Sequence, residues 1–546
     1  MNKQKNWQHN IFSRFRLNTV FIILIFILII IIARLFSITV LSPVPINYNK
    51  NTNSNNSFIR GNIYDRNKNL LAISIPTQSL FLQIEQIKDE ITVSKTLAKI
   101  LNIPYDTILT KIRTKQGFYI LKRKLSEQEI KNCESLNLPG VYLKKEYSRF
   151  YPNKNIAGHL LGFCDIDQKG IEGIEKSLNN ELIPPRKNNN TNSLIKGNDV
   201  YLTIDLQLQY QFEKALLYGY EKEMADSVNG IILDAVSGEI LAIANKPDFD
   251  PNLFYQYSQN DFRNQAIFKA FEPGSVLKVF ALAALLDKNK LTESILYNCS
   301  GKYTHNDVTI NCQGIHGDVT YPDIIKYSCN SGMVQAAQKI DPRILYTYLK
   351  KFGFGTAVDI NLPGENPGVL RRPGLWSFQS MLSIPIGQEI SVTALQIAQA
   401  ATAFSNNGHL VVPKIIHHIT DQNEKILFHF KRTELRSVIS ELTAKKILTA
   451  MSEVMKPGGT GQSGEIEGFD VAGKSGTGQI IDPETGKYSK ENFSSSLLTV
   501  FPAQSPKYIV YIVFHYPKGK IKFGGFIVSP VFKEIAEKMV LYYNIY

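Results

Sequence analysis

The segment that decides the fold is GFDVAGKSGTG, residues 468–478, which fits two unrelated kinds of structure. Its first eight residues match the phosphate-binding pattern G-x-x-x-x-G-K-[ST], which requires a buried strand before the loop and a helix directly after it. The preceding residues are polar and rich in glycine, and Gly476, Gly478 and Pro483 exclude a helix after Ser475. Both flanks fail, so the segment is predicted to be an edge strand whose small residues let a ligand approach its backbone.

The N-terminal part of the chain predicts a membrane anchor. Residues 17–40 are apolar apart from a few positions, and they exceed the about 20 residues that a helix needs to span a bilayer. Basic residues precede them without any acidic residue, namely Lys3, Lys5, Arg14 and Arg16. This asymmetry places residues 1–16 in the cytoplasm and the chain from about residue 41 outside it, where a nucleotide hydrolase would have little substrate. A cleaved signal peptide is the alternative, but no A-x-A cleavage site follows the apolar run.

Composition and charge bound the class of protein. With 546 residues, of which 44% are hydrophobic, the chain has material for several globular domains. Its 61 Lys and Arg against 48 Asp and Glu give a net charge of +13, which favours anionic surroundings such as membrane phospholipid or an acidic polymer. The basic residues form no long run, so no nucleic-acid partner is expected.

Five cysteines are spread over the chain outside the apolar segment: Cys133, Cys164, Cys299, Cys312 and Cys329. Cys299 and Cys312 are predicted to lie on two strands of a hairpin, and a disulfide between them is compatible with a position outside the cytoplasm. A zinc site is the rival interpretation, because His305, Asp307 and His316 lie close by in sequence. Free thiols are the third, and the residues alone leave all three open.

The order of the expected elements predicts the fold class. Two Asn-rich stretches, residues 46–57 and 184–199, flank a mixed α/β region and are predicted to be a spacer and a linker. After the second, a strand enters a long helix, and NGIILDAVSGEILAIANKP predicts a β-hairpin that turns at Ser237-Gly238. Helices follow, then strands, then a last helix. This order indicates an α+β fold in which one antiparallel sheet packs against a helical cluster.

An upstream serine and lysine supply candidate chemistry. In FEPGSVLKVFALAALL, Ser275 opens an apolar helix and Lys278 follows three residues later, on the same helical face. A serine hydroxyl is a poor nucleophile until a base takes its proton, and a lysine can do so if burial keeps it neutral. The positive field of the helix N-terminus would favour an acyl oxyanion at this position.

Two further motifs follow in a meaningful order. KYSCNSG contains the S-x-N triplet of Ser328 and Asn330, and Lys474-Ser475-Gly476-Thr477 is a K-S-G-T sequence at the edge of a late strand. Each motif alone is weak, since an S-x-N triplet can also be a helix-capping turn. The order S-x-x-K, S-x-N, K-S-G resembles that of penicilloyl-serine transferases.

The whole chain resembles a class B penicillin-binding protein, a peptidoglycan D,D-transpeptidase. RGNIYDRNKNLLA, residues 60–72, is similar to the box that opens the family's N-terminal region, although Lys68 stands where the family usually has Gly. GNDVYLTIDLQLQ is similar to the entry to the transpeptidase domain. The resemblance implies a β-lactamase-like transpeptidase domain after an elongated α/β pedestal and a single transmembrane helix. The expected organisation is a tail (1–16), an anchor (17–40), a spacer (41–57), a pedestal or dimerisation domain (58–183), a linker (184–199) and the transpeptidase domain (200–546).

The resemblance also implies the roles of the motif residues. Ser275 would be the acyl-enzyme nucleophile and Lys278 its general base, while Ser328 and Asn330 would relay protons and bind the substrate amide. The third motif would bind the substrate carboxylate through Lys474, Ser475, Gly476 and Thr477. The backbone N–H groups of Ser275 and Thr477 would form the oxyanion hole. Ser475 replaces the more usual Thr but keeps the hydroxyl.

The implied function is cross-linking of peptidoglycan stem peptides through a serine acyl-enzyme that β-lactams also acylate. EPGS before the nucleophile and VAGKSGTGQIIDPETGKY in the third motif are more similar to division-type than to elongation-type enzymes. The expected partners are the cytoplasmic membrane, a polytopic membrane glycosyltransferase contacted by the anchor and the Arg60 region, and other division proteins. No cofactor or metal is expected in the catalytic site. The alternatives are an elongation-type enzyme, a D,D-carboxypeptidase or β-lactamase, and a non-catalytic scaffold or sensor.

Overall fold

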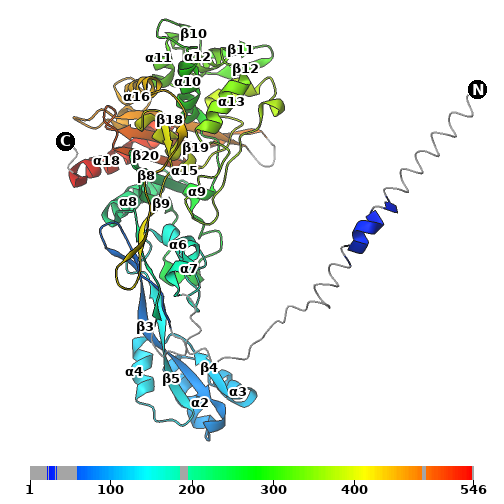
Figure 1. Ribbon diagram of the computed structural model, residues 1–546, viewed down its shortest axis with the longest axis vertical. Coiled ribbons are helices and arrows are strands. Elements are labelled where there is room, and N and C mark those ends of the chain that lie inside the picture. Colours follow the sequence, from blue (N-terminus) through cyan, green and yellow to red (C-terminus); the bar gives the residue numbers. More distant parts are fainter. Residues whose placement is uncertain are drawn as a thin grey trace, which may run out of the picture. The chain divides into compact units, whose positions relative to one another are not determined.

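The computed structural model describes residues 21–22, 24–30, 32, 58–184, 195–481 and 487–543. The chain divides into two units, Met1–Asn56 and Ser57–Tyr546 (Figure 1). The described residues of the first unit are helical and exposed. No helix within the described ranges is both long and apolar enough to cross a membrane. Most of the predicted anchor lies outside these ranges, so the anchor stays a prediction.

A five-stranded antiparallel sheet forms the centre of the C-terminal part of the second unit. Its strand order is β18-β19-β20-β8-β9, and every neighbouring pair is antiparallel. The predicted hairpin at Ser237-Gly238 is confirmed, because β8 and β9 flank this turn. The predicted edge strand is β18. The five strands are β8 (Ser227–Asp234), β9 (Ile240–Lys246), β18 (Ala472–Ile481), β19 (Tyr488–Phe501) and β20 (Tyr508–His515).

Five long helices pack on or near this sheet, as the sequence predicts for an α+β fold. The helix α8 contacts β8 and β9 and also packs against α18, whereas α15 contacts β8, β19 and β20. The helices α10 and α16 contact each other, and α16 also contacts α15 and β18. Their bounds are α8 (Leu206–Lys222), α10 (Leu277–Asp287), α15 (Ala394–Ser405), α16 (Glu441–Met455) and α18 (Ser529–Tyr543).

The helix α10 is buried on all sides. Every residue from Leu277 to Leu286 is buried. A helix that is apolar on all sides can remove its side chains from water only in the interior of a domain. The sequence LKVFALAALL therefore predicts this central position. The packing of α10 thereby fixes its first turn, and it also fixes the position of residues 274–276, which directly precede this turn.

Short helices and strands surround α10 on the side away from the sheet (Figure 1). Two antiparallel pairs lie here, β10 with β13 and β11 with β12. The strands are β10 (Tyr297–Cys299), β11 (Lys302–His305), β12 (Val308–Asn311) and β13 (Gly317–Val319). The helices are α11 (Tyr321–Lys326), α12 (Asn330–Ala337) and α13 (Pro342–Lys351).

Further short elements lie elsewhere in this part of the unit. They are α9 (Gln265–Phe268), α14 (Ser380–Ser383), α17 (Gly524–Ile527), β14 (His409–Val411) and β17 (Glu434–Ser437).

A second sheet has the order β16-β15-β7-β2-β3-β4, with β5 also paired to β3. It joins strands from both ends of the unit, because β7 pairs with β2 on one side and with β15 on the other. Its strands are β2 (Ile63–Tyr64), β3 (Leu70–Gln83), β4 (Phe118–Lys122), β5 (Val141–Phe150), β7 (Asp199–Leu202), β15 (Ile416–Thr420) and β16 (Ile426–His429).

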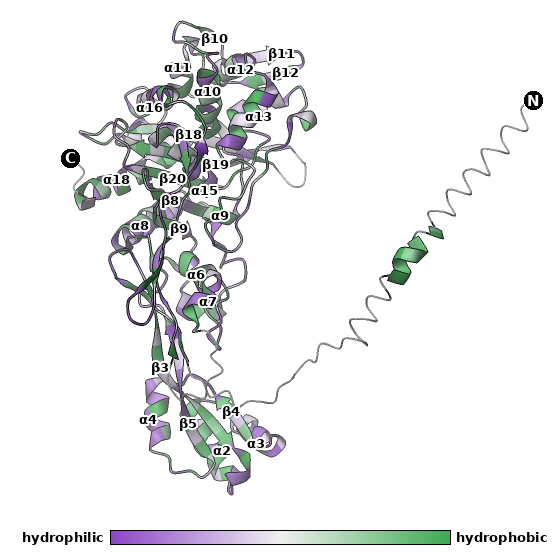
Figure 2. Ribbon diagram, viewed as in Figure 1, coloured by the Kyte–Doolittle hydropathy of each residue, from purple (hydrophilic) through white to green (hydrophobic). Residues whose placement is uncertain are grey.

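A separate small core fills the region around β3 and β4. Buried residues of the amphipathic helices α2 and α3 pack against Leu80 and Leu82 of β3, with Cys133 of α4 at the edge of this cluster. The helices of residues 58–184 are α2 (Glu90–Leu101), α3 (Tyr105–Thr114), α4 (Glu127–Glu134), α5 (Gly158–Leu161), α6 (Gly173–Ser177) and α7 (Asn179–Leu182). Figure 2 shows green residues on the inner faces of α2, β3 and β5.

Two details differ from the expectations. Part of the predicted linker is strand, because β6 (Ile195–Lys196) pairs in parallel with β1 (Phe58–Ile59) and Asp199 begins β7. Periodicity cannot reveal such short strands, whose only support is pairing with distant partners. Lys68 has a φ of +66°, so the turn that usually holds a glycine keeps its left-handed conformation with a lysine.

The Arg60 side chain lies in the interior, where it and Arg149 bind the same buried carboxylate. Its Nε donates to Glu175 Oε2 at 2.6 Å, and Arg149 Nε donates to the other oxygen of the same carboxylate at 2.6 Å. Arg60 and Glu175 are 0% exposed. The buried Arg60 side chain therefore stabilises the fold, and a partner that contacts this region would do so through other residues.

Candidate active site

Ser275 lies in a short 3-10 helix, Gly274–Val276, that leads directly into α10. Gly274 has a φ of +54°, and a methyl group added there would lie 2.6 Å from the carbonyl oxygen of Thr477. Only glycine accommodates both the left-handed backbone and this close approach. The glycine at position 274 thus allows the loop that carries the half-buried Ser275 to pack against the backbone of β18.

Lys278 follows one turn later and is 0% exposed. Its Nζ donates hydrogen bonds to the carbonyl oxygen of Ser328, to Asn330 Oδ1 at 2.6 Å and to Ser328 Oγ at 3.3 Å. Burial lowers the pKa of Lys278 to about 8. Among the hydrogen bonds of the described chain, none joins its Nζ to Ser275, so the i, i+3 spacing places the two residues on one face without a direct bond.

Ser328 lies in the turn between α11 and α12, and Asn330 is the first residue of α12. Ser328 has a φ of +56°, a conformation that costs a non-glycine residue about 1 kcal/mol or more and that often marks a functional position. Asn330 is held from both ends, because its Oδ1 accepts from Lys278 and its Nδ2 donates to the carbonyl oxygen of Asn311 at 2.9 Å. The second motif is therefore a rigid turn aimed at Lys278.

Lys474 enters the same cluster from β18. It is 0% exposed, and its Nζ donates to Ser328 Oγ at 3.0 Å and to the carbonyl oxygen of Ser475 at 2.8 Å. Burial, and secondarily the nearby Lys278, hold the pKa of Lys474 well below its usual value. A hydroxyl oxygen has two lone pairs, so Ser328 Oγ can accept from both lysines at once.

The other residues of the third motif face a cavity. Side chains at i and i+2 of a strand share a face, so Ser475 and Thr477 point to the side opposite Lys474. Ser475 Oγ donates to Thr460 Oγ1 at 3.0 Å, and Thr477 Oγ1 accepts from the backbone N–H of Gly524 at 3.3 Å. A Cβ at Gly476 would lie 2.7 Å from Val276 Cγ2 and 2.8 Å from the carbonyl oxygen of Pro273. The small residues of β18 thus let the nucleophile loop approach its backbone, as well as a ligand.

The three motifs meet at one cavity of about 360 Å³, which is lined by Ser275, Ser328, Ser475 and Thr477. Sequence reasoning missed the remaining walls. They come from Gln313, from residues 458–463 in the glycine-rich segment before β18, and from residues 523–526 around α17. The glycine content of residues 458–463 was the one sequence feature that could have indicated a wall of the cavity. Their position there depends on contacts with residues far away in sequence.

Ser275, two lysines and a strand edge with hydroxyl groups lie close together, as a serine acyltransferase would require, and two family models match the chain. Residues 230–537 match the penicillin binding protein transpeptidase domain, and residues 56–200 match the penicillin-binding protein dimerisation domain. The chain therefore belongs to the penicillin-binding proteins and is a serine-type peptidoglycan D,D-transpeptidase.

Individual relatives are similar over most of their length. The chain is 30% identical to the peptidoglycan D,D-transpeptidase FtsI of Buchnera aphidicola, over 89% of this chain and 87% of that protein. It is 30% identical to the stage V sporulation protein D of Bacillus subtilis, over 86% of this chain and 76% of that protein. The structure of penicillin-binding protein 3 of Mycobacterium tuberculosis in complex with aztreonam is similar with a TM-score of 0.72 and 25% identity, covering 90% of this chain and 97% of that one.

Proposed function

We propose that Ser275 is the nucleophile, that Lys278 accepts its proton, and that Ser328 relays protons between the two lysines and the reacting groups. The observation that carries this proposal is the position of Ser328 Oγ, 3.3 Å from Lys278 Nζ and 3.0 Å from Lys474 Nζ, at a cavity that Ser275 also lines. Two buried amines that share one hydroxyl cannot both keep a proton at low cost. One of them is thereby available as a base at neutral pH.

The roles follow from this arrangement. Neutral Lys278 accepts the Ser275 proton as Oγ attacks the carbonyl carbon of the donor stem peptide, and an acyl bond forms to Ser275. The leaving D-alanine amine receives a proton through Ser328, and the acceptor amine later attacks the ester and returns a proton by the same route. The N–H groups of Ser275 and Thr477 stabilise the oxyanion of each tetrahedral intermediate.

The third motif fits recognition of the substrate carboxylate. Ser475 and Thr477 present hydroxyl groups to the cavity, and Gly476 between them keeps the backbone accessible. Lys474 lies behind them as a buried positive charge, which favours an anionic ligand when the amine is protonated. Asn330, whose Oδ1 accepts from Lys278, would hold the substrate amide.

Within the family, we infer a septal role, with residues 17–40 as a single membrane anchor and the catalytic part outside the cytoplasm. The EPGS sequence before the nucleophile and the similarity to a protein named FtsI support the division type. A membrane glycosyltransferase would supply the strands to be cross-linked. A fluorescent fusion should gather at the division site, whereas label along the lateral wall would contradict the septal role.

The direct test is labelling of the purified full-length chain with a fluorescent penicillin, with the Ser275→Ala variant beside it. A stable covalent label on the wild type that is absent from the variant is expected. Ser294→Ala is a matched control, because Ser294 lies on a surface loop after α10.

Each other outcome has a defined meaning. Rapid loss of the label from the wild type would replace the transpeptidase by a D,D-carboxypeptidase or β-lactamase, since water would then attack the acyl-enzyme. No label on a folded wild type would contradict the catalytic proposal and favour a scaffold.

A further inference from the structure

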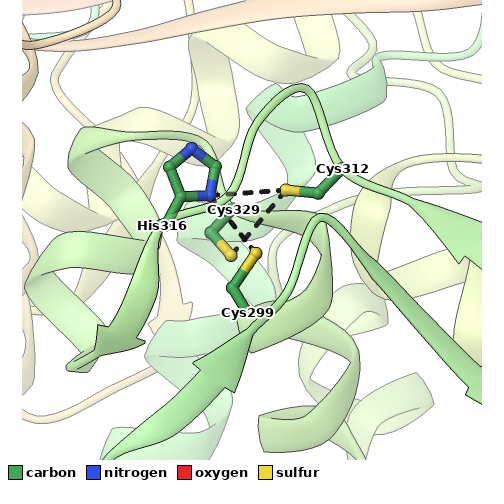
Figure 3. A group of neighbouring side chains, drawn as sticks. All are labelled: Cys299, Cys312, His316 and Cys329. Atoms are coloured by element: carbon green, nitrogen blue, oxygen red, sulfur yellow. Dashed lines mark hydrogen bonds between the residues drawn. The ribbon is translucent and has the colours of Figure 1, made fainter.

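Four potential metal ligands converge beside the second motif (Figure 3). Cys299 ends β10, Cys312 directly follows β12, His316 directly precedes β13, and Cys329 directly precedes α12. Their three Sγ atoms and one imidazole nitrogen all lie within 4.8 Å of one another. Figure 3 shows the four side chains pointing toward a common centre from different loops.

Three of the six distances among these atoms are close to the edges of a zinc tetrahedron. Zn–S bonds of about 2.3 Å and Zn–N bonds of about 2.0–2.1 Å imply edges of about 3.8 Å between two sulfurs and about 3.6 Å between sulfur and nitrogen. Cys312 Sγ lies 3.8 Å from Cys329 Sγ. His316 Nδ1 lies 3.4 Å from Cys299 Sγ and 3.5 Å from Cys312 Sγ.

The same geometry argues against the disulfide that the sequence left open. All five cysteines are free, and a disulfide would need a sulfur–sulfur distance of about 2.05 Å. Cys299 and Cys312 also do not face each other across a hairpin, because β10 pairs with β13 and the hairpin β11–β12 lies between them. His305 and Asp307, the other ligands considered from sequence, are not in the cluster, whereas Cys329 completes it.

Backbone donors around the sulfurs provide an independent indication. The N–H groups of Asn330 and Gly332, in the first turn of α12, donate to Cys312 Sγ and Cys329 Sγ at 3.3 Å each. Such N–H donors and a helix N-terminus stabilise thiolates, the form in which cysteine binds metals. His316 is also oriented, because its ring stacks on Tyr327 with centroids 5.5 Å apart.

We propose that Cys299, Cys312, His316 and Cys329 bind one Zn²⁺ ion in a closed, four-coordinate structural site. Three thiolates and one neutral imidazole satisfy a tetrahedral ion and leave no open position for substrate. Binding releases the thiol protons to solvent, and no oxidant or reductant takes part. Thiolate-rich tetrahedral sites favour Zn²⁺ over Mg²⁺ or Ca²⁺, which prefer oxygen ligands.

The site's purpose follows from its position, in an inference that rests on the proposed function. Cys329 lies between Ser328 and Asn330, and Asn330 links the ligand Cys312 to Lys278 through its N–H and its Oδ1. A bound metal would therefore lock the left-handed turn at Ser328 and the amide of Asn330 in place. The ligands are positioning residues for the second motif, and touch no reacting atom.

Metal content of the full-length chain, purified without a metal-affinity step or chelator, tests the site. About one zinc per chain is expected in the wild type and none in Cys299→Ala or His316→Ala. Cys133→Ala is the matched control, because Cys133 is equally buried but belongs to the separate core around α2. Co²⁺ added to the metal-free chain should give a thiolate-to-cobalt charge-transfer band.

A second measurement on the wild type avoids variants that fail to fold. A mercurial reagent that caps thiolates should release the bound zinc in step with modification of three cysteines. A wild-type chain that takes up neither Zn²⁺ nor Co²⁺ after reduction, a different metal at that stoichiometry, or a disulfide among these cysteines would overturn the site.

The link to catalysis has its own readout. Removal of zinc by a chelator should lower the second-order rate constant of penicillin acylation about tenfold, and added Zn²⁺ should restore it. Ser275→Ala should lose acylation but keep its zinc, so failure of the proposed function is distinguishable from failure of the metal site. Unchanged acylation in a zinc-free chain would overturn the positioning role.

Discussion

Two buried clusters of basic residues in this chain differ in the presence of a counterion, and one holds arginines whereas the other holds lysines. In the first, Arg60 and Arg149 share the carboxylate of Glu175, with both ion pairs at 2.6 Å. In the second, Lys278 and Lys474 meet at Ser328 Oγ, and within the described residues neither lysine forms an ion pair. Both clusters are removed from solvent.

The difference distinguishes a structural cluster from the cluster proposed to be catalytic. Burial alone would raise the pKa of Glu175, but Arg149 and Arg60 hold it below its usual value, so the triad stays charged. Burial lowers the pKa of both lysines, and no carboxylate opposes this change. A buried charge that has a counterion can stabilise a fold. A buried amine that has no counterion has a lowered pKa and can act as a base near neutral pH.

The largest expected effect is on catalysis. Lys278→Met should lower the second-order rate constant of penicillin acylation by up to about 10⁴-fold, because the general base is lost. The free energy of unfolding should change by less than about 1 kcal/mol, since an apolar side chain of similar length replaces a desolvated amine. Lys288→Met, at the exposed end of α10, is the control and should acylate normally. A large loss of stability in Lys278→Met would contradict the prediction, because the lysine cluster would then stabilise the fold as the arginine cluster does.

The next effect is on stability. Glu175→Gln keeps the shape of the side chain but leaves two buried guanidinium groups without a counterion. The free energy of unfolding should fall by about 3–5 kcal/mol, measured by denaturant titration. A nearly unchanged unfolding free energy would show that Arg60 and Arg149 do not depend on the carboxylate.

A pH profile sharpens the contrast further. Because the pKa of Lys278 is about 8 and the base acts unprotonated, the acylation rate constant should rise about tenfold per pH unit below 8 and level off above it. Burial also raises the pKa of the neighbouring Glu272 to about 7. Glu272→Gln therefore serves as the control and should keep the rise toward pH 8. A midpoint near 7 that disappears in this variant would assign the profile to Glu272.

The smallest effect is expected at an exposed ion pair in the same sequence box as Arg60. Arg66 lies 3.3 Å from Glu239, and its side chain is 32% exposed. Arg66→Met should change the free energy of unfolding by less than about 1 kcal/mol, because solvent screens the pair. A loss as large as that of Glu175→Gln would mean that the counterion matters regardless of burial.

Sequence reasoning was most successful where a local pattern has one physical solution. The apolar run after Ser275 has no polar face, so it forms the buried helix α10. The alternating residues around Ser237-Gly238 form the hairpin β8–β9, and the glycines of GKSGTG form the edge strand β18. The α+β class follows from the order of these elements.

It was least successful where contacts join distant residues. Cys299 and Cys312 have the spacing of a hairpin pair, yet they lie in one cluster with His316 and Cys329. Ile195 and Lys196 read as linker but pair with β1. The loop around Thr460 reads as a polar flank but lines the cavity. None of these contacts leaves a periodic signal.

Residue types and local spacing are enough to establish the class of protein, the three motifs and their order. They do not show that Lys278 Nζ bonds to Ser328 and Asn330 rather than to Ser275, or that Lys474 reaches the same hydroxyl across 146 residues, because these contacts depend on the packing of distant segments. The tertiary structure also decided which four side chains meet beside Asn330. The reason is that burial and distance, which set the protonation of a lysine or the ligands of a metal, are properties of the packed chain and of no single segment.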